Sequence, residues 1–198
     1  MPWHELEARL SDGRAPSSVG WNAGGDGPAF SATRQPFEPV LSRRQPTVPY
    51  AELHCTSNFS FLEGAAHPEE LAEVAAALGL SALAITDRNG LYGVVRFAEA
   101  ARAVNLPTIF GVELDCAAGD IVLLARGPSG YARMARAISE GQLAGSKGAP
   151  VFSFPTVGQT VRDHCLVLTG GRTSAVVQAL VQHGPAEAER SLRSLIEH

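Results

Sequence analysis

The chain has 198 residues, 45 % hydrophobic and 18 % charged, which is typical of one globular domain with flanking segments. Its net charge is −4, and residues 1–46 carry five residues of each sign, so the rest supplies the whole acidic excess. A basic face for nucleic acid is therefore not expected. Three separated cysteines without a CxxC pattern, and no apolar run of about 20 residues, favour a reduced, cytoplasmic protein without a membrane span.

Residues 1–48 predict a disordered leader. From residue 11 the segment is rich in Gly, Pro, Ser and Arg, and it cannot bury enough apolar surface to offset its ordering entropy. Trp3, Leu6 and Leu10 have helical spacing, so residues 3–10 could form a short amphipathic helix, and a frayed terminus is the alternative. The folded domain is expected over residues 50–198.

Strands and helices are expected to alternate from Tyr50 onward. A short strand runs to His54, and a helix begins at Pro68 with two acids in its first turn and ends at Gly79. Its expected apolar face comprises Leu71, Val74, Ala75 and Leu78. Further strands are expected at 82–86, 107–112, 121–125 and 164–169, further helices near 94–101, 131–138, 176–181 and 186–196, and a Gly-rich loop at 141–150.

This alternation favours an α/β fold with a parallel sheet and right-handed crossovers. Five strands fit an open sheet or part of a barrel, because a closed eight-stranded barrel usually takes about 250 residues. If the sheet is a barrel, we expect it to be small or cut short.

Polar side chains follow the expected strands. His54 and Thr56 follow the first, Asp87 and Arg88 the second and Glu113 the third, while Asp120 precedes the fourth. Because functional sites lie at the carboxyl ends of parallel strands, these His and carboxylate side chains could provide the ligands of a divalent-metal site.

Each residue of this group also has a structural interpretation. Asp87 is more often a helix cap than a ligand, Glu113 could simply pair with Arg88, and His54 alone would more often be a core histidine. Arg88 argues against a metal, because a guanidinium cannot coordinate a cation and repels it. No Walker loop, GxGxxG or GxSxG motif is present, so no catalytic residue is assigned.

Several motifs follow one another in a specific order: LHCTS at 53–57, FSFLEG at 59–64, AITD at 84–87, GLYG at 90–93 and FGVEL at 110–114. In this order and spacing they resemble the polymerase-and-histidinol-phosphatase (PHP) domain at the amino terminus of bacterial replicative DNA polymerase alpha subunits. VRFAEAA at 95–101 and the leader with Trp3 resemble the actinobacterial error-prone branch. The resemblance covers residues 50–198 and implies a distorted (βα)7 barrel, incomplete in this chain.

The sequence departs from the family pattern at positions that hold metal in the family. Thr56 stands for the second His of His-x-His, Arg88 for the His of Thr-Asp-His, and Gly171 for the Cys of Thr-Gly-Cys. Asp120 stands where a His is common, which leaves it as a possible ligand. The resemblance thus implies a remnant site of His54, Glu113 and Asp87.

Several ligand positions carry other residues, and one of them carries the cationic side chain of Arg88. These replacements would remove most of the affinity for zinc or manganese. We therefore expect no resident cofactor, with zinc or manganese as the candidates if the remnant site binds metal. The resemblance implies a structural and interaction module of an error-prone polymerase in DNA repair and damage-tolerant synthesis. Its partners would be the polymerase domains of the same full-length protein, other replication or translesion proteins, and DNA through the full-length protein.

Two alternatives remain open at this stage. The first is a stand-alone metal-dependent phosphoesterase that uses His54, Asp87, Glu113 and Asp120. The second is a truncated product without an independent function, whose missing barrel strands would leave an open sheet edge.

Overall fold

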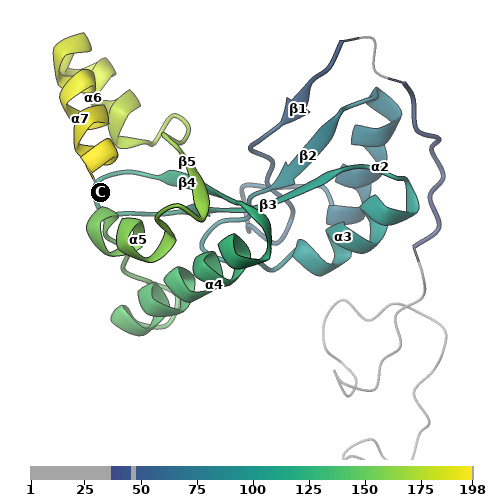
Figure 1. The fold of residues 1–198 in the computed structure, drawn as a ribbon, viewed down its shortest axis with the longest axis horizontal. Coiled ribbons are helices and arrows are strands. Elements are labelled where there is room, and N and C mark those ends of the chain that lie inside the picture. Colours follow the sequence, from purple (N-terminus) through teal and green to yellow (C-terminus); the bar gives the residue numbers. More distant parts are fainter. Residues whose placement is uncertain (1–36, 46–47, 198) are drawn as a thin grey trace, which may run out of the picture. The chain divides into compact units, whose positions relative to one another are not determined.

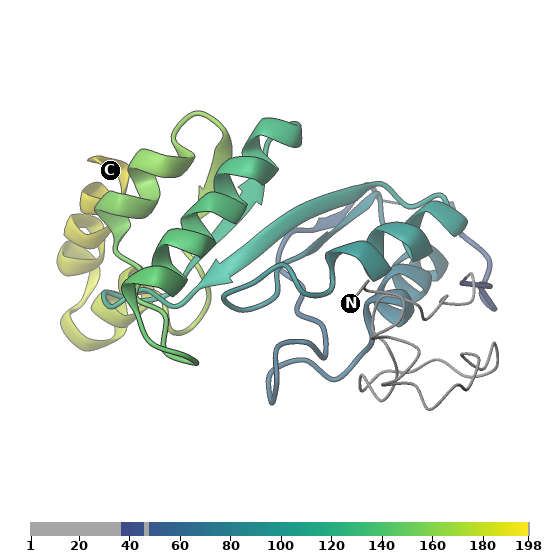
Figure 2. The same cartoon turned by 90° about the horizontal axis from the view of Figure 1, so that it is seen from below.

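The computed structural model describes residues 37–45 and 48–197, and the helix expected at 3–10 lies outside them. The fold is α/β, with a curled half-barrel sheet flanked by helices (Figures 1 and 2). Its five strands lie in sequence order: β1 (Ala51–Glu52), β2 (Ala82–Ile85), β3 (Thr108–Leu114), β4 (Ile121–Ala125) and β5 (Cys165–Leu168). In the described parts of the chain, no helix is long and apolar enough to cross a membrane.

The sheet is parallel in one half only. β1, β2 and β3 pair in parallel, as predicted, but β3 pairs with β4, and β4 with β5, in antiparallel orientation. The prediction of a parallel sheet is therefore wrong for β4 and β5. The physical reason at β3–β4 is the connection, because residues 115–120 are too few for the crossover of a dozen or more residues that a parallel pair requires.

The first helix, α2 (Pro68–Leu78), begins and ends where the sequence predicts. The Glu70 carboxylate accepts a 2.8 Å hydrogen bond from the backbone N–H of His67, and Gly79 closes the helix in the left-handed conformation (φ 75°). Its buried face differs from the predicted one, because Leu78 is 73 % exposed. Small residues pack inward instead, and α2 lies against α3 (Val94–Ala103): the buried positions of α2 are Pro68, Ala72, Ala75 and Ala76.

Four helices follow in the second half of the chain: α4 (Gly127–Ala144), α5 (Phe154–Val161), α6 (Ala175–His183) and α7 (Pro185–Glu197). The sequence prediction missed α5. Its N-cap residue is Ser153, whose side chain accepts a hydrogen bond from the backbone N–H of Thr156. Gly141 does not start a loop as expected but lies inside α4. A Cβ there would come within 2.0 Å of the Phe152 ring, so the glycine makes room for that ring.

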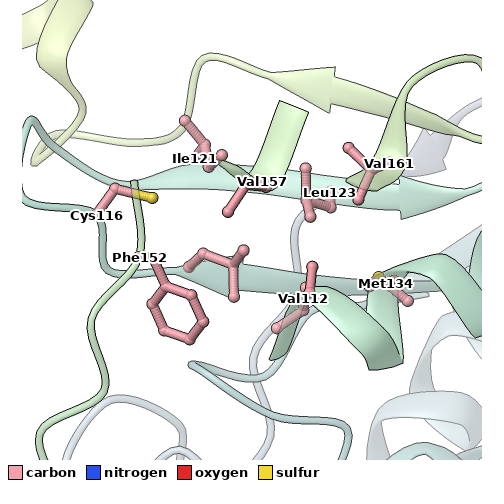
Figure 3. Close-up of a cluster of buried hydrophobic side chains, with 10 residues drawn as sticks. Val112, Cys116, Ile121, Leu123, Met134, Phe152, Val157 and Val161 are labelled. Carbon is pink, nitrogen blue, oxygen red and sulfur yellow. The ribbon is translucent and has the colours of Figure 1, made fainter. Parts of the chain in front are cut away.

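The main hydrophobic core lies on the side of β3 and β4 that α4 and α5 cover (Figure 3). Val112 and Leu123, which face each other across the β3–β4 pair, both point into it. Since side chains alternate along a strand, Glu113 and its partner Val122 lie on the opposite face. The buried members of the core are Val112, Leu114, Cys116, Ile121, Leu123, Met134, Ala137, Phe152, Val157 and Val161.

The described part of the expected leader lies against α2. Residues 37–45 contain no helix or strand, the backbone N–H of Arg44 donates to the carbonyl of Ala76 at 2.9 Å, and the N–H groups of Val40 and Leu41 donate to Glu73.

Candidate functional site

The predicted site residues lie at one edge of the sheet, and the topology explains why. β1, β2 and β3 are parallel, so their carboxyl ends share an edge. Because β4 runs antiparallel to β3, its first residues return to the same edge, which places Asp120 beside Glu113. Arg88 and Glu113 are joined by an isolated parallel bridge, which extends the β2–β3 pairing beyond Ile85.

His54 and Glu113 form a close side-chain pair at this edge. The His54 Nε2 atom lies 2.9 Å from Glu113 Oε2, and the Glu113 side chain is 10 % exposed. The hydrogen bond to Glu113, against the opposing effect of burial, raises the pKa of His54 above its ordinary value. Both residues were expected here, but Glu113 lies within β3 rather than just after it.

Arg88 is surrounded by four carboxylates. Its Nη1 atom lies 3.1 Å from Glu63, 3.6 Å from Asp120 and 3.9 Å from Glu113, and its Nη2 atom lies 3.2 Å from Asp115. Although burial opposes it, the hydrogen bond to Asp115 and the charges of Asp120 and Glu63 raise the pKa of Arg88. A permanent cation therefore occupies the centre of this carboxylate group.

Asp87 turns away from the other carboxylates and holds a loop. Its Oδ1 atom accepts hydrogen bonds from the backbone N–H and hydroxyl of Ser57, both at 2.8 Å, and from the hydroxyl of Ser60 at 3.1 Å. Its Oδ2 atom accepts from the N–H of Gly93, the residue that caps α3, at 3.1 Å. The buried carboxylate thus has four donors, which favours the structural interpretation of Asp87 over the ligand interpretation.

Asp120 connects the Arg88 group to the loop that follows β5. Its Oδ2 atom accepts a 2.5 Å hydrogen bond from the Thr173 hydroxyl. Burial raises the pKa of Asp120, and the bond from Thr173 and the charge of Arg88 oppose this rise. In the same loop, a Cβ on Gly171 would lie 3.9 Å from the His54 ring, so position 171 borders the site. Thr56 is partly buried, two residues after His54.

Three contributors were missed by the sequence prediction: Glu63, Asp115 and Thr173. Asp115 could have been found, because it lies two positions after Glu113 and strand alternation places both on one face. Glu63 comes from the turn after β1, and its approach to Arg88 depends on how that turn folds back. Thr173 depends likewise on a loop conformation for which the sequence carries no periodic signal.

The arrangement does not fit a resident divalent metal. Such an ion needs several His or carboxylate donors directed at one point, but Glu113 and Asp120 are directed at Arg88, and Asp87 is used by Ser57 and Ser60. Within residues 37–45 and 48–197, no three His, Cys, Asp or Glu side chains are placed to hold a metal ion. The group can neutralise charge and join loops.

The fold and the site define a class of α/β domain in which a curled half-barrel sheet carries His and carboxylate side chains at the carboxyl edge of its parallel strands. Within that class, the chain belongs to the PHP domain family, whose profile matches residues 52–198.

Curated relatives at 43–44 % identity are error-prone DNA polymerases of actinobacteria. The protein from Cutibacterium acnes is 43 % identical over 212 residues, covering 100 % of this chain and 18 % of the relative. The protein from Mycobacterium tuberculosis strain H37Rv is 44 % identical over 211 residues, covering 98 % of this chain and 19 % of the relative. The chain thus spans about a fifth of the length of these relatives.

The solved structures that match have a lower sequence identity to the chain than these polymerases. A protein from Bifidobacterium adolescentis described as a metal-dependent phosphoesterase has a TM-score of 0.41 and 20 % identity, covering 78 % of this chain and 53 % of that one. An amidohydrolase from Chromobacterium violaceum has a TM-score of 0.39 and 21 % identity, covering 73 % of this chain and 54 % of that one.

Proposed function

We propose that the chain serves as the PHP domain of an error-prone DNA polymerase, in DNA repair and damage-tolerant synthesis in the bacterial cytoplasm. Its own role is structural: it contacts the polymerase domains of the same protein and performs no hydrolysis. DNA reaches it only through the full-length polymerase. Identity to error-prone polymerases over the whole chain supports the parent protein, and a single observation supports the structural role.

That observation is the position of Arg88 among the carboxylates. A metal-dependent phosphoesterase lowers the pKa of a bound water with a divalent ion held by several ligands. Here the Arg88 guanidinium lies within 4 Å of Glu63, Glu113, Asp115 and Asp120 and supplies the positive charge that those carboxylates require. In this proposal the remnant metal site now joins three segments of the chain: the loop that follows β1, strand β3 itself, and the connection between β3 and β4.

A stand-alone phosphoesterase fits less well. It would need His54, Glu113 and Asp120 to share an ion, with Arg88 in the middle of them and Asp87 already bonded to four donors. The sequence identity also lies with polymerases rather than with a short hydrolase.

The test is a domain replacement. The matching fifth of the Mycobacterium tuberculosis polymerase is exchanged for this chain, and DNA synthesis on a primed template is compared with that of the parent and of a version without the domain. We expect the polymerase that carries the exchanged domain (the replaced polymerase) to retain DNA synthesis, and the version without the domain to lose it. A replaced polymerase without activity, or isolated chain that hydrolyses p-nitrophenyl phosphate with manganese, would contradict the proposal.

A further inference from the structure

Two neighbouring apolar side chains stand out at the turn after β1. Phe61 is 85 % exposed and Leu62 is 90 % exposed, and they follow each other in the chain. Single exposed apolar residues are normal on a protein surface, so exposure alone assigns nothing to this apolar tip (Phe61 and Leu62). What distinguishes the tip is how the loop beneath it is held.

The loop is fixed from below by the residues that follow β2. Ser57 and Ser60 are bonded to the Asp87 carboxylate, and the backbone N–H of Arg88 donates to the Ser60 hydroxyl at 2.8 Å. On the other side of the tip, Glu63 forms its ion pair with Arg88 at 3.1 Å. One flank of the apolar tip is therefore attached to Asp87 and Arg88, and the other flank is attached to Arg88.

The backbone at the tip is closed tightly and carries strain. The N–H groups of Glu63 and Gly64 both donate to the Ser60 carbonyl at 3.0 Å, and a Cβ on Gly64 would come within 2.0 Å of the Ser57 carbonyl oxygen. Leu62 has a positive φ of 66°, in the left-handed region that is unfavourable for a non-glycine residue. A fixed, strained turn that holds two apolar side chains in water has the form of a preorganised binding element.

The charges around the tip select the kind of partner. Glu63 follows Leu62 directly, and Glu113, Asp115 and Asp120 lie around the same guanidinium. Four carboxylates outnumber the Arg88 guanidinium and the His54 imidazole together, so this edge is acidic and repels nucleic acid phosphates. A protein surface with an apolar pocket bordered by basic side chains complements it.

We propose that the apolar tip docks into such a pocket on the polymerase portion of the protein, an inference that rests on the proposed function. The matched relatives have more than four-fifths of their length outside the matching region, and a tethered domain meets that remainder at high effective concentration. Asp87 and Arg88 act as positioning residues for the tip: they hold the loop and do not touch the partner.

A photo-crosslinking experiment in the replaced polymerase tests the docking. The residue p-benzoylphenylalanine is introduced at Phe61 and, as the control, at Leu143, which is 86 % exposed near the end of α4. We expect irradiation to join position 61, and not position 143, to peptides of the polymerase portion. Because both side chains are exposed, neither replacement should disturb folding.

The outcomes separate the two proposals. Cross-links from position 61 to DNA or to a second copy, or no product above the Leu143 control, would overturn the docking while polymerase activity still supports the proposed function. A replaced polymerase that synthesises no DNA before any crosslinker is introduced would overturn the proposed function and the docking with it. As a second measurement, Phe61→Ser should leave urea unfolding of the isolated chain unchanged but increase proteolytic release of the domain from the replaced polymerase, and equal release would contradict the docking.

Discussion

Replacement of Arg88 with methionine removes the guanidinium and keeps a side chain of similar length. Four carboxylates lose their common cation in this variant: Glu63, Glu113, Asp115 and Asp120. Because those carboxylates belong to three separate segments of the chain, their mutual repulsion would act directly on the edge of the sheet. We therefore expect Arg88→Met to lower the free energy of unfolding.

The size of the loss follows from how exposed each pair is. Glu63 and Asp115 are 41 % and 55 % exposed, so each of their pairs contributes about 0.2–1 kcal/mol. Glu113 and Asp120 are 10 % and 4 % exposed, and removal of one partner from a fully buried pair costs about 3–5 kcal/mol. Arg88 itself is 28 % exposed, and solvent screening reduces that figure, so we expect a total loss of about 2–4 kcal/mol.

Urea unfolding followed by circular dichroism measures this loss. The matched control is Arg136→Met, because Arg136 pairs with Glu140 at 2.8 Å on the surface of α4 and is 71 % exposed. Such a solvent-exposed helix pair contributes little to stability, because water and salt screen it. If Arg88→Met costs no more than the control, the guanidinium does not serve as the counter-ion of the site, and the reasoning about Arg88 is refuted.

Three further predictions concern Asp87, His54 and Cys116. Asp87→Asn places an amide N–H₂ against the backbone or hydroxyl donors that share the Asp87 carboxylate. We therefore expect the free energy of unfolding to fall by about 2–4 kcal/mol in the same urea assay, and an unchanged value would refute the anchoring role. Because the hydrogen bond to Glu113 raises the pKa of His54, the protonated side chain stabilises the fold. This stabilisation is fully present below pH 6.5, the ordinary pKa of histidine, and is lost as the pH rises through the pKa of the folded state. The stability difference between the chain and His54→Gln should therefore shrink above pH 6.5, and a difference independent of pH would contradict the pairing with Glu113. Burial raises the pKa of Cys116 to about 12, so a disulfide reagent at mildly alkaline pH should modify Cys116 only in urea, and rapid labelling of the native thiol would contradict its burial.

Local signals in the sequence were sufficient for most elements. Pro68 and Gly79 mark the two ends of α2 because Pro suits the first helical turn and Gly adopts the left-handed closing conformation. The apolar run at 121–125 is β4 itself. α5 was missed because the neighbouring Gly-rich segment suggested a loop, whereas Gly141 is helical and packs against Phe152.

Strand direction and hydrogen-bond partners were harder to predict, because they depend on contacts between distant residues. An apolar strand pattern is the same for parallel and antiparallel neighbours, and only the short connection after β3 indicated the reversal. The sequence placed Asp87 and Arg88 beside each other and left their roles open. The structure separates those roles, since Asp87 bonds to Ser57 and Ser60 while Arg88 meets the carboxylates.

The metal content of the chain is the most direct test of the central proposal, that the Arg88 guanidinium takes the place of a divalent ion. The chain is incubated with manganese or zinc and desalted, and its bound metal is measured by inductively coupled plasma mass spectrometry. As the positive control, the variant Thr56→His/Arg88→His/Gly171→Cys places donors at the three positions that the resemblance assigns to metal ligands, and it should take up metal. The proposed structural role predicts far less than one ion per chain in the unaltered protein, and stoichiometric metal together with phosphoester hydrolysis would contradict it.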